Sequence, residues 1–170
     1  SGNNNAYAQD NEISWLDWGG IDPANADLLD FTRTLIAIRK TYPLLHRARF
    51  LAGEYNEELD VKDVTWLSPL AEELTEETWH DANARCFGML LDGRAQPTGI
   101  KRRGDDATLL IVTNAHHETV EFTLPQVPEG NHWLRLIDTM ESRAGKTPTF
   151  PLEAAYEAAP RSLALFVLES

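Results

Sequence analysis

The residue types most suggestive of chemistry lie in the first eighteen positions of the chain. Sugar rings carry an apolar C–H face that stacks on flat aromatic side chains, while amides and carboxylates hydrogen-bond the hydroxyl groups. Both kinds of group occur here: Asn3, Asn4, Asn5, Gln9, Asp10, Asn11 and Glu12 with Tyr7, Trp15 and Trp18. The segment therefore suggests a carbohydrate-contacting loop. The alternative, which composition alone favours, is a surface loop whose tryptophans pack under the following helix.

Carboxylate pairs give a weaker pattern. Glycoside hydrolysis needs two carboxyl groups about 5 Å apart, or roughly 6.5–9.5 Å apart in inverting enzymes. The chain has 27 acidic residues, and their spacing singles out no such pair. We interpret Glu57-Glu58, Glu72-Glu73 and Glu76-Glu77 as solvated loop charges.

Histidines and the one cysteine also give no strong site. The histidines are His46, His80, His116, His117 and His132. His116 and His117 are adjacent in a predicted turn, where exposure is more typical than metal ligation, so no metal is expected. Cys86 lies in an apolar run and is interpreted as a small buried hydrophobe rather than a nucleophile. No Gly-rich phosphate loop is present, and no cofactor is expected.

The element that follows the first loop is an amphipathic helix, predicted over residues 26–42. Its apolar residues recur every three or four positions and therefore share one face. These residues are Leu28, Phe31, Leu35, Ile38 and Tyr42. Asn25 is a candidate N-cap, and Asp22-Pro23 is an alternative start. Pro43 should end the helix.

From about Leu51 the pattern changes to short apolar runs bounded by turn residues, which is typical of an antiparallel β-sandwich. The predicted strands are 61–67, 85–91, 108–113, 119–124, 133–138 and 162–168. The run 108–113 is apolar on both faces, which favours a central position in a covered sheet. Residues 114–117 are predicted to form a hairpin turn. Trp133 is expected in the core, with Trp66 and Trp79 anchoring the long loop between strands.

Length and charge exclude several classes. The chain has 170 residues and a net charge of -12, so it should repel nucleic acid and anionic membranes. It is too short for a complete (β/α)₈ barrel, which needs about 250 residues. A single cysteine excludes an internal disulfide and suits a reducing compartment. No apolar run approaches the ~18 residues of a membrane span. Residues 1–5 are polar and show no signal peptide. A cytoplasmic location is expected, and export stays open as the alternative because a fragment could have lost its own N-terminus.

Three blocks of sequence carry a family resemblance. The first is the run NNNAYAQDNE at 3–12, followed by WLDW at 15–18. The second is DVTW at 63–66, LTEETW at 74–79 and GMLLDG at 88–93. The third is NAHHE at 114–118 with VEFTLP at 120–125. In this order the blocks resemble the bacterial glycogen debranching enzymes of the isoamylase type, in the α-amylase superfamily.

The resemblance implies an architecture for the chain. The family has an N-terminal sandwich, a catalytic (β/α)₈ barrel and a C-terminal antiparallel sandwich. Residues 1–50 would be the last loop and helix of the barrel, and 51–170 the C-terminal sandwich. The family's catalytic carboxylates lie on earlier barrel strands and have no matching position here. The whole enzyme would hydrolyse α-1,6 branch linkages of glycogen or limit dextrin with retention, and this chain alone should be inactive.

The resemblance also implies substrate-contacting residues. Asn4, Asn5 and Tyr7 match the loop after the eighth barrel strand, and Asp10 and Asn11 continue it, so these five are expected to contact glucose units. Two residues depart from the family pattern. Ala8 stands where members often have Cys. Ala71 stands where a Gly is expected, and Ala resists the positive φ that such a turn uses.

Two further readings remain beside the enzyme fragment. One is a free-standing glucan-binding module with stacking aromatics. The other, compatible with the fragment, is a structural cap that packs on the missing barrel. Without the barrel, the apolar helix face would pack on the sandwich, pair with a second copy of the chain, or stay mobile.

Overall fold

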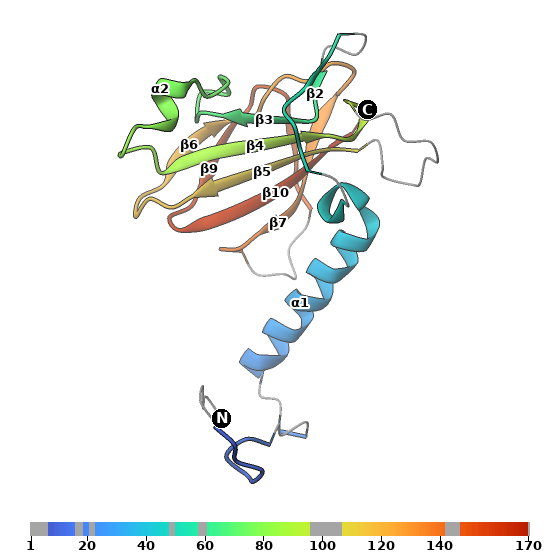
Figure 1. Cartoon of the computed structure of the whole chain (residues 1–170), viewed down its shortest axis with the longest axis vertical. Coiled ribbons are helices and arrows are strands. Elements are labelled where there is room, and N and C mark those ends of the chain that lie inside the picture. The colour runs from blue at the N-terminus through green and yellow to red at the C-terminus, as the bar shows by residue number, and fades with distance from the viewer. Residues whose placement is uncertain are drawn as a thin grey trace. The chain divides into compact units, whose positions relative to one another are not determined.

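The structure, a computed structural model, describes residues 7–15, 19–20, 23–47, 50–57, 61–95, 107–141 and 147–169 (Figure 1). Over these ranges the protein is mainly β, with antiparallel sheets and few helices, which confirms the predicted fold class. Contacts divide the chain into two compact units, Ser1–Ala37 and Ile38–Ser170. No helix in the described ranges is long and apolar enough to span a membrane.

The long helix α1 spans Pro23–Thr41 and is followed by the 3₁₀ helix η1, Pro43–His46. The start at Pro23 agrees with the alternative predicted from Asp22-Pro23, and Asn25 lies inside the helix instead of capping it. Proline suits the first helical position because a backbone N–H there would have no acceptor within the helix, so proline loses no hydrogen bond. Arg39 and Lys40 in the last turn complement the helix dipole.

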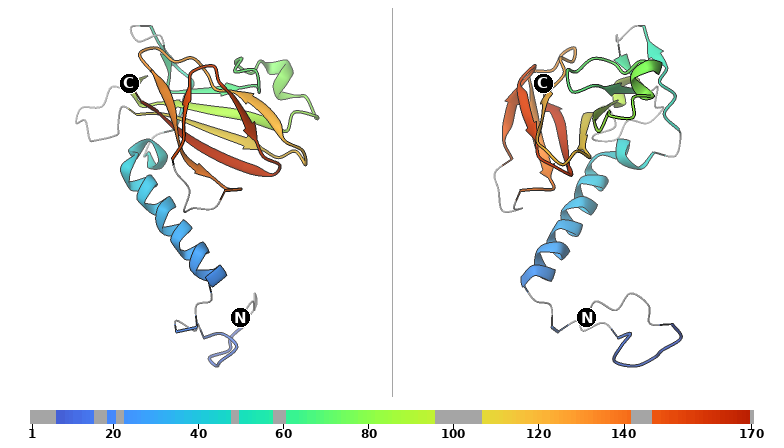
Figure 2. Two further views of the ribbon diagram at one scale, coloured as in Figure 1. Left: turned by 180° about the vertical axis from the view of Figure 1, so that it is seen from behind. Right: turned by 90° about the vertical axis from the view of Figure 1, so that its left-hand side faces the viewer.

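The larger unit is built on one six-stranded antiparallel sheet with the order β3-β4-β5-β10-β7-β8 (Figure 2). The bounds are β3 Val64–Leu67, β4 Cys86–Asp92, β5 Thr108–Asn114, β10 Ser162–Glu169, β7 His132–Asp138 and β8 Thr149–Pro151. The run predicted to be central, β5, has β4 and β10 as its neighbours.

Two further pairs complete the β structure. β6 (Val120–Thr123) pairs with β9 (Ala155–Ala158), and β1 (Tyr55–Asn56) pairs with β2 (Val61–Lys62). The predicted strand 61–67 is therefore interrupted at Asp63. A short helix α2, Glu76–Trp79, and the 3₁₀ helix η2, Gly93–Ala95, flank β4. The strands β1, β8 and β9 and the helix α2 were not predicted from the sequence.

The hydrophobic core lies between the six-stranded sheet and the β6–β9 pair. Phe122 and Tyr156 from the small pair join Trp133 and Phe166 from the large sheet in one cluster of buried residues. The Trp133 ring is fully buried and its Nε1 donates to the Pro125 carbonyl at 3.0 Å, which satisfies its one polar group. The predicted core position of Trp133 is confirmed.

The opposite face of the large sheet is also apolar. Directly paired residues form a row across five strands: Trp66, Met89, Ile111, Leu165 and Ile137. Leu165 and Ile137 are buried, whereas the first three are only partly covered. Trp66 also meets Trp79 of α2 edge to face, with ring centroids 5.2 Å apart, as expected for side chains that hold the long loop.

The predicted hairpin at residues 114–117 is wrong. β5 and β6 do not pair with each other, because β5 lies in the large sheet and β6 pairs with β9. The physical reason is Asn114, which is 1% exposed. Its side-chain amide donates to the carbonyls of Ala158 and Ala159, each at 3.0 Å, at the end of β9. This turns the chain out of one sheet and into the other.

The turn that contains Ala71 forms despite the missing glycine. Ala71 has φ of 60°, in the left-handed region that costs a non-glycine residue about 1–2 kcal/mol. The turn is closed by Ala71 N–H donating to the Ser68 carbonyl at 3.0 Å and Ser68 N–H donating to the Glu72 carbonyl at 2.8 Å. These bonds offset the strain.

Candidate functional site

The predicted glucan-contacting segment forms a compact turn around Asn11. The Asn11 side-chain oxygen accepts from the Ile13 N–H at 3.0 Å, and its carbonyl accepts from the Ser14 and Trp15 N–H groups at 2.9 and 3.1 Å. Such side-chain to backbone bonds are what make Asn a strong turn former. Asn11 therefore shapes the segment. Asn4, Asn5 and Trp18 lie outside the described residues.

The turn presents aromatic rings beside a carboxylate. Trp15 Nε1 donates to Asp10 Oδ1 at 2.8 Å, which fixes the indole next to the acid. The Trp15 and Tyr7 side chains are 64% and 84% exposed. The structure thus brings Tyr7, Asp10 and Asn11 onto one short segment with accessible ring faces. That arrangement suits sugar stacking and hydrogen bonding.

A pocket of about 210 Å³ opens on the larger unit, where β2, β3 and β4 meet the loop that follows β6. Its wall includes Tyr55, Lys62, Glu73, Gln126 and Pro128. This site was not predicted, because its residues come from several separate stretches of chain. No local spacing could have joined them.

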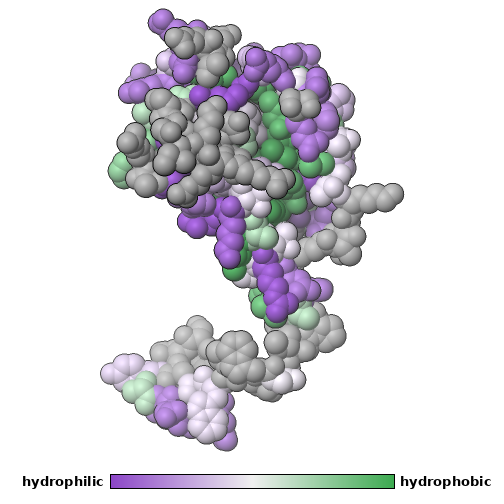
Figure 3. All heavy atoms as spheres, turned by 90° about the vertical axis from the view of Figure 1, so that its right-hand side faces the viewer, coloured by the Kyte–Doolittle hydropathy of each residue, from purple (hydrophilic) through white to green (hydrophobic). Residues whose placement is uncertain are grey.

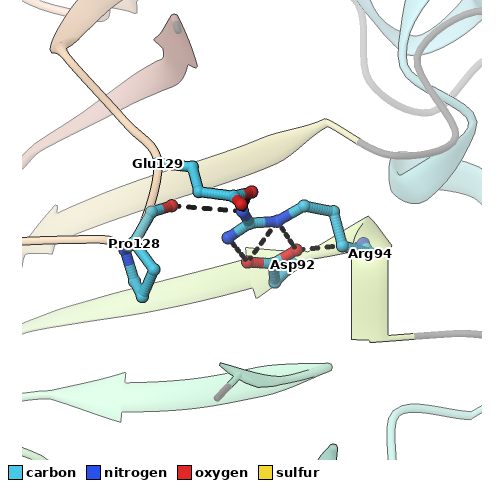
Figure 4. A network of polar contacts seen from close by, with 4 residues as sticks. All are labelled: Asp92, Arg94, Pro128 and Glu129. Carbon is cyan, nitrogen blue, oxygen red and sulfur yellow. Dashed lines mark hydrogen bonds and ion pairs between the residues drawn. The ribbon is translucent and has the colours of Figure 1, made fainter. Parts of the chain in front are cut away.

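One side of this pocket is held by a polar network centred on Arg94 (Figure 4). The Arg94 guanidinium forms an ion pair with the buried Asp92, with Nη2 to Oδ2 at 2.7 Å. Its Nη1 donates to the Pro128 carbonyl at 3.1 Å and to Glu129 at 3.2 Å. Hydrogen bonding to Asp92 raises the pKa of Arg94. Arg94 therefore joins the end of β4 to the loop after β6.

His116, His117 and Glu118 form a group whose possible ligand atoms lie within 4.8 Å of one another. The two rings stack with centroids 4.2 Å apart. However, His116 Nδ1 accepts the Glu118 N–H at 3.1 Å, so a neutral His116 carries its proton on Nε2. Metal binding at Nε2 would require the other tautomer and break this bond. The geometry suits a stacked surface turn better than a metal site.

Cys86 faces the core and is 7% exposed, which confirms the small buried hydrophobe that the sequence predicts. Burial raises its pKa to about 11, far above the range of a reactive thiolate. The thiol is therefore protonated at neutral pH and is a poor nucleophile.

Comparisons with known proteins place these features in a family context. Residues 63–166 match the family described as isoamylase, C-terminal. A glycogen operon protein GlgX homolog from Mycobacterium tuberculosis is 40% identical over 141 residues, covering 81% of this chain and 19% of the relative. The glycogen debranching enzyme of Dickeya chrysanthemi is 33% identical over 74% of this chain and 16% of its own length. The isoamylase of Pseudomonas amyloderamosa is 26% identical over 84% of this chain and 16% of its own. The chain spans less than a fifth of the length of these relatives.

Proposed function

Because the chain belongs to the isoamylase C-terminal family, we propose that it is the C-terminal region of a glycogen debranching enzyme. The whole enzyme hydrolyses α-1,6 branch linkages in glycogen or limit dextrin. The family match over 63–166 carries this proposal. Relatives named for glycogen metabolism and debranching support it. We expect the enzyme to act in the cytoplasm, which the single buried thiol suits.

In this proposal the chain contributes no catalytic carboxylate. The two buried acids among the described residues have structural partners: Asp92 binds Arg94, and Asp63 accepts the Ala52 and Gly53 N–H groups at 3.0 and 2.8 Å. A retaining glycosidase instead holds two carboxyl groups about 5 Å apart beside the scissile bond. The roles of Asp92 and Asp63 support a chain that assists hydrolysis performed by residues elsewhere.

The proposed assistance is structural, through packing on the preceding catalytic barrel. Leu28 and Leu35 of α1 are 59% and 41% exposed, and Phe50 is almost fully exposed. Figure 3 shows apolar surface gathered in a band over the β-rich unit. Exposed apolar surface of this kind typically marks an interaction site. Packing on the catalytic barrel would remove these apolar side chains from water.

The second proposed contribution is contact with the glucan itself. Tyr7 and Asp10, with Asn4, Asn5 and Asn11, would meet glucose units at the mouth of the barrel. The exposure of the Tyr7 and Trp15 rings supports this role. The exposed aromatics equally suit a free-standing glucan-binding module, which is the second candidate function.

A chimera separates these roles. In the Dickeya chrysanthemi enzyme, the region that matches this chain would be replaced by residues 1–170. We expect a soluble enzyme that releases linear oligosaccharides from limit dextrin. Deleting residues 51–170 from the chimera should abolish solubility. A deleted chimera that stays soluble and keeps its kcat would contradict the structural role and favour the binding module.

A further inference from the structure

The pocket described above has a wall chemistry that points to one class of ligand. The polar side chains of its lining include Lys62, Thr65, Glu73 and Gln126. The apolar part of the lining includes Val127 and Pro128, and the ring of Tyr55, which is about half exposed, also borders the pocket. A pyranose ring likewise presents both kinds of surface, with hydroxyl groups around its edge and C–H bonds on its faces.

The charges on the wall disfavour a charged ligand. Lys62 Nζ lies 2.6 Å from Glu73 Oε1, so the one described cation of the lining is already paired. The Asp92 carboxylate is bound by Arg94. With these groups neutralised in pairs, neither a phosphate nor a metal cation finds a free counter-charge among the described lining residues. Both paired groups can still hydrogen-bond hydroxyls.

The pocket is also held in shape before a ligand arrives. Lys62 and Glu73 link β2 to the chain after β3, which a bridge between Leu67 and Glu73 also fixes. On the other side, Arg94 holds the carbonyl of Pro128 (Figure 4). Fixed walls lower the entropy cost of binding.

We propose that this pocket binds a glucosyl unit of an α-glucan, as a site additional to the segment 7–15. The inference rests on the proposed function, which supplies the ligand class. Gln126 donates and accepts hydrogen bonds with sugar hydroxyls, the Lys62–Glu73 pair does the same, and Tyr55 contacts a C–H face.

The test is a titration of the ¹⁵N-labelled 170-residue chain with maltoheptaose up to about 10 mM, which covers the weak affinities expected of one subsite. We expect saturable amide shifts at residues 61–65, 126 and 127. Gln126→Ala should weaken binding about 2- to 10-fold by removing one hydrogen-bonding side chain. Glu121→Ala, an exposed change on β6, is the matched control and should leave the affinity unchanged.

Each other result overturns the pocket proposal. Shifts confined to residues 7–15 would do so while leaving the glucan-contacting segment in place. Shifts on addition of inorganic phosphate but not of maltoheptaose would assign the pocket to anions. The absence of any shift would show that this chain does not bind maltoheptaose. The proposed function is tested separately, by hydrolysis of limit dextrin by the chimera.

Discussion

The side-chain amide of Asn114 lies 3.0 Å from the carbonyl oxygen of Ala158, and this bond connects the two sheets of the sandwich. Asn114 ends β5 in the large sheet, and Ala158 ends β9 in the small one. The same amide donates to the Glu118 carbonyl at 2.9 Å, and the side-chain oxygen accepts the His116 N–H at 2.9 Å. One buried side chain thus fixes the whole crossing between sheets.

Asn114→Ala should lower the free energy of unfolding by about 2–4 kcal/mol, because the buried Ala158 carbonyl and three partly buried backbone groups lose their partner. Asn114→Asp should cost more at neutral pH, since it places a carboxylate against backbone carbonyls, and part of that loss should recover in acid. Urea unfolding followed by near-UV circular dichroism measures both. A loss below about 0.5 kcal/mol for the alanine variant would contradict this role.

Gly88 lies where the large sheet meets the small one. A Cβ at this position would come within 2.6 Å of the Phe122 ring, which is fully buried. Gly88→Ala should therefore destabilise the protein by about 1–3 kcal/mol through overpacking. Phe122→Leu should relieve the clash, so the double variant should be more stable than the sum of the two single changes allows. Strict additivity in urea unfolding would show that the contact is not the cause.

Several parts of this fold were predictable because their signals are local. The apolar spacing of 3 and 4 defines α1, and alternating or fully apolar runs define the six predicted strands. β9 was missed because Ala155–Ala158 is short and half alanine, so its strand character comes from pairing with β6. The hairpin prediction failed because Asn114 forms bonds to residues 44 and 45 positions away.

The candidate sites divide in the same way. Tyr7, Asp10 and Asn11 lie on one turn, and their types alone suggested a carbohydrate-contacting segment. The pocket joins Tyr55, Lys62 and Gln126 through β pairing and the Arg94 network, which no sequence spacing records. A site that is assembled by long-range strand pairing could therefore not be predicted from the sequence alone.

Stability should fall as pH rises through the alkaline range because of Cys86. Burial raises its pKa in the folded protein from 9.0 to about 11. The stabilising contribution is present below pH 9, where the thiol is protonated in both states. It is lost between pH 9 and 11, because the unfolded chain releases the proton first. The loss is on the order of 1–3 kcal/mol.

Cys86→Ala removes this titration, so the measurement is the difference between the two proteins in urea unfolding at pH 8, 9, 10 and 11. The parent should lose more stability than the variant over this range. Tyr156, whose pKa burial also raises, titrates in both proteins and cancels in the comparison. Parallel pH profiles would contradict the burial of the thiol.

Arg94→Ala should lower the free energy of unfolding by on the order of 3 kcal/mol. The change leaves the carboxylate of Asp92, which is 2% exposed, without its cation. Arg94→Lys should lower the free energy of unfolding less than Arg94→Ala does, since lysine keeps the charge but cannot reproduce the forked contact. Faster amide exchange around residues 127–130 should accompany both changes. Glu129→Gln is the control, because Glu129 is 83% exposed and its pair should contribute less than about 1 kcal/mol. Equal losses from all three changes would argue against Asp92 as the essential partner.

We propose that the chain serves a debranching enzyme whose catalytic groups lie elsewhere. The direct test measures α-1,6 hydrolysis of limit dextrin by the isolated 170-residue chain and by the chimera that carries it, at equal molar concentration. We predict turnover by the chimera and none above background by the chain alone. Turnover by the isolated chain that follows the protein through purification, or a soluble chimera without activity, would contradict the account.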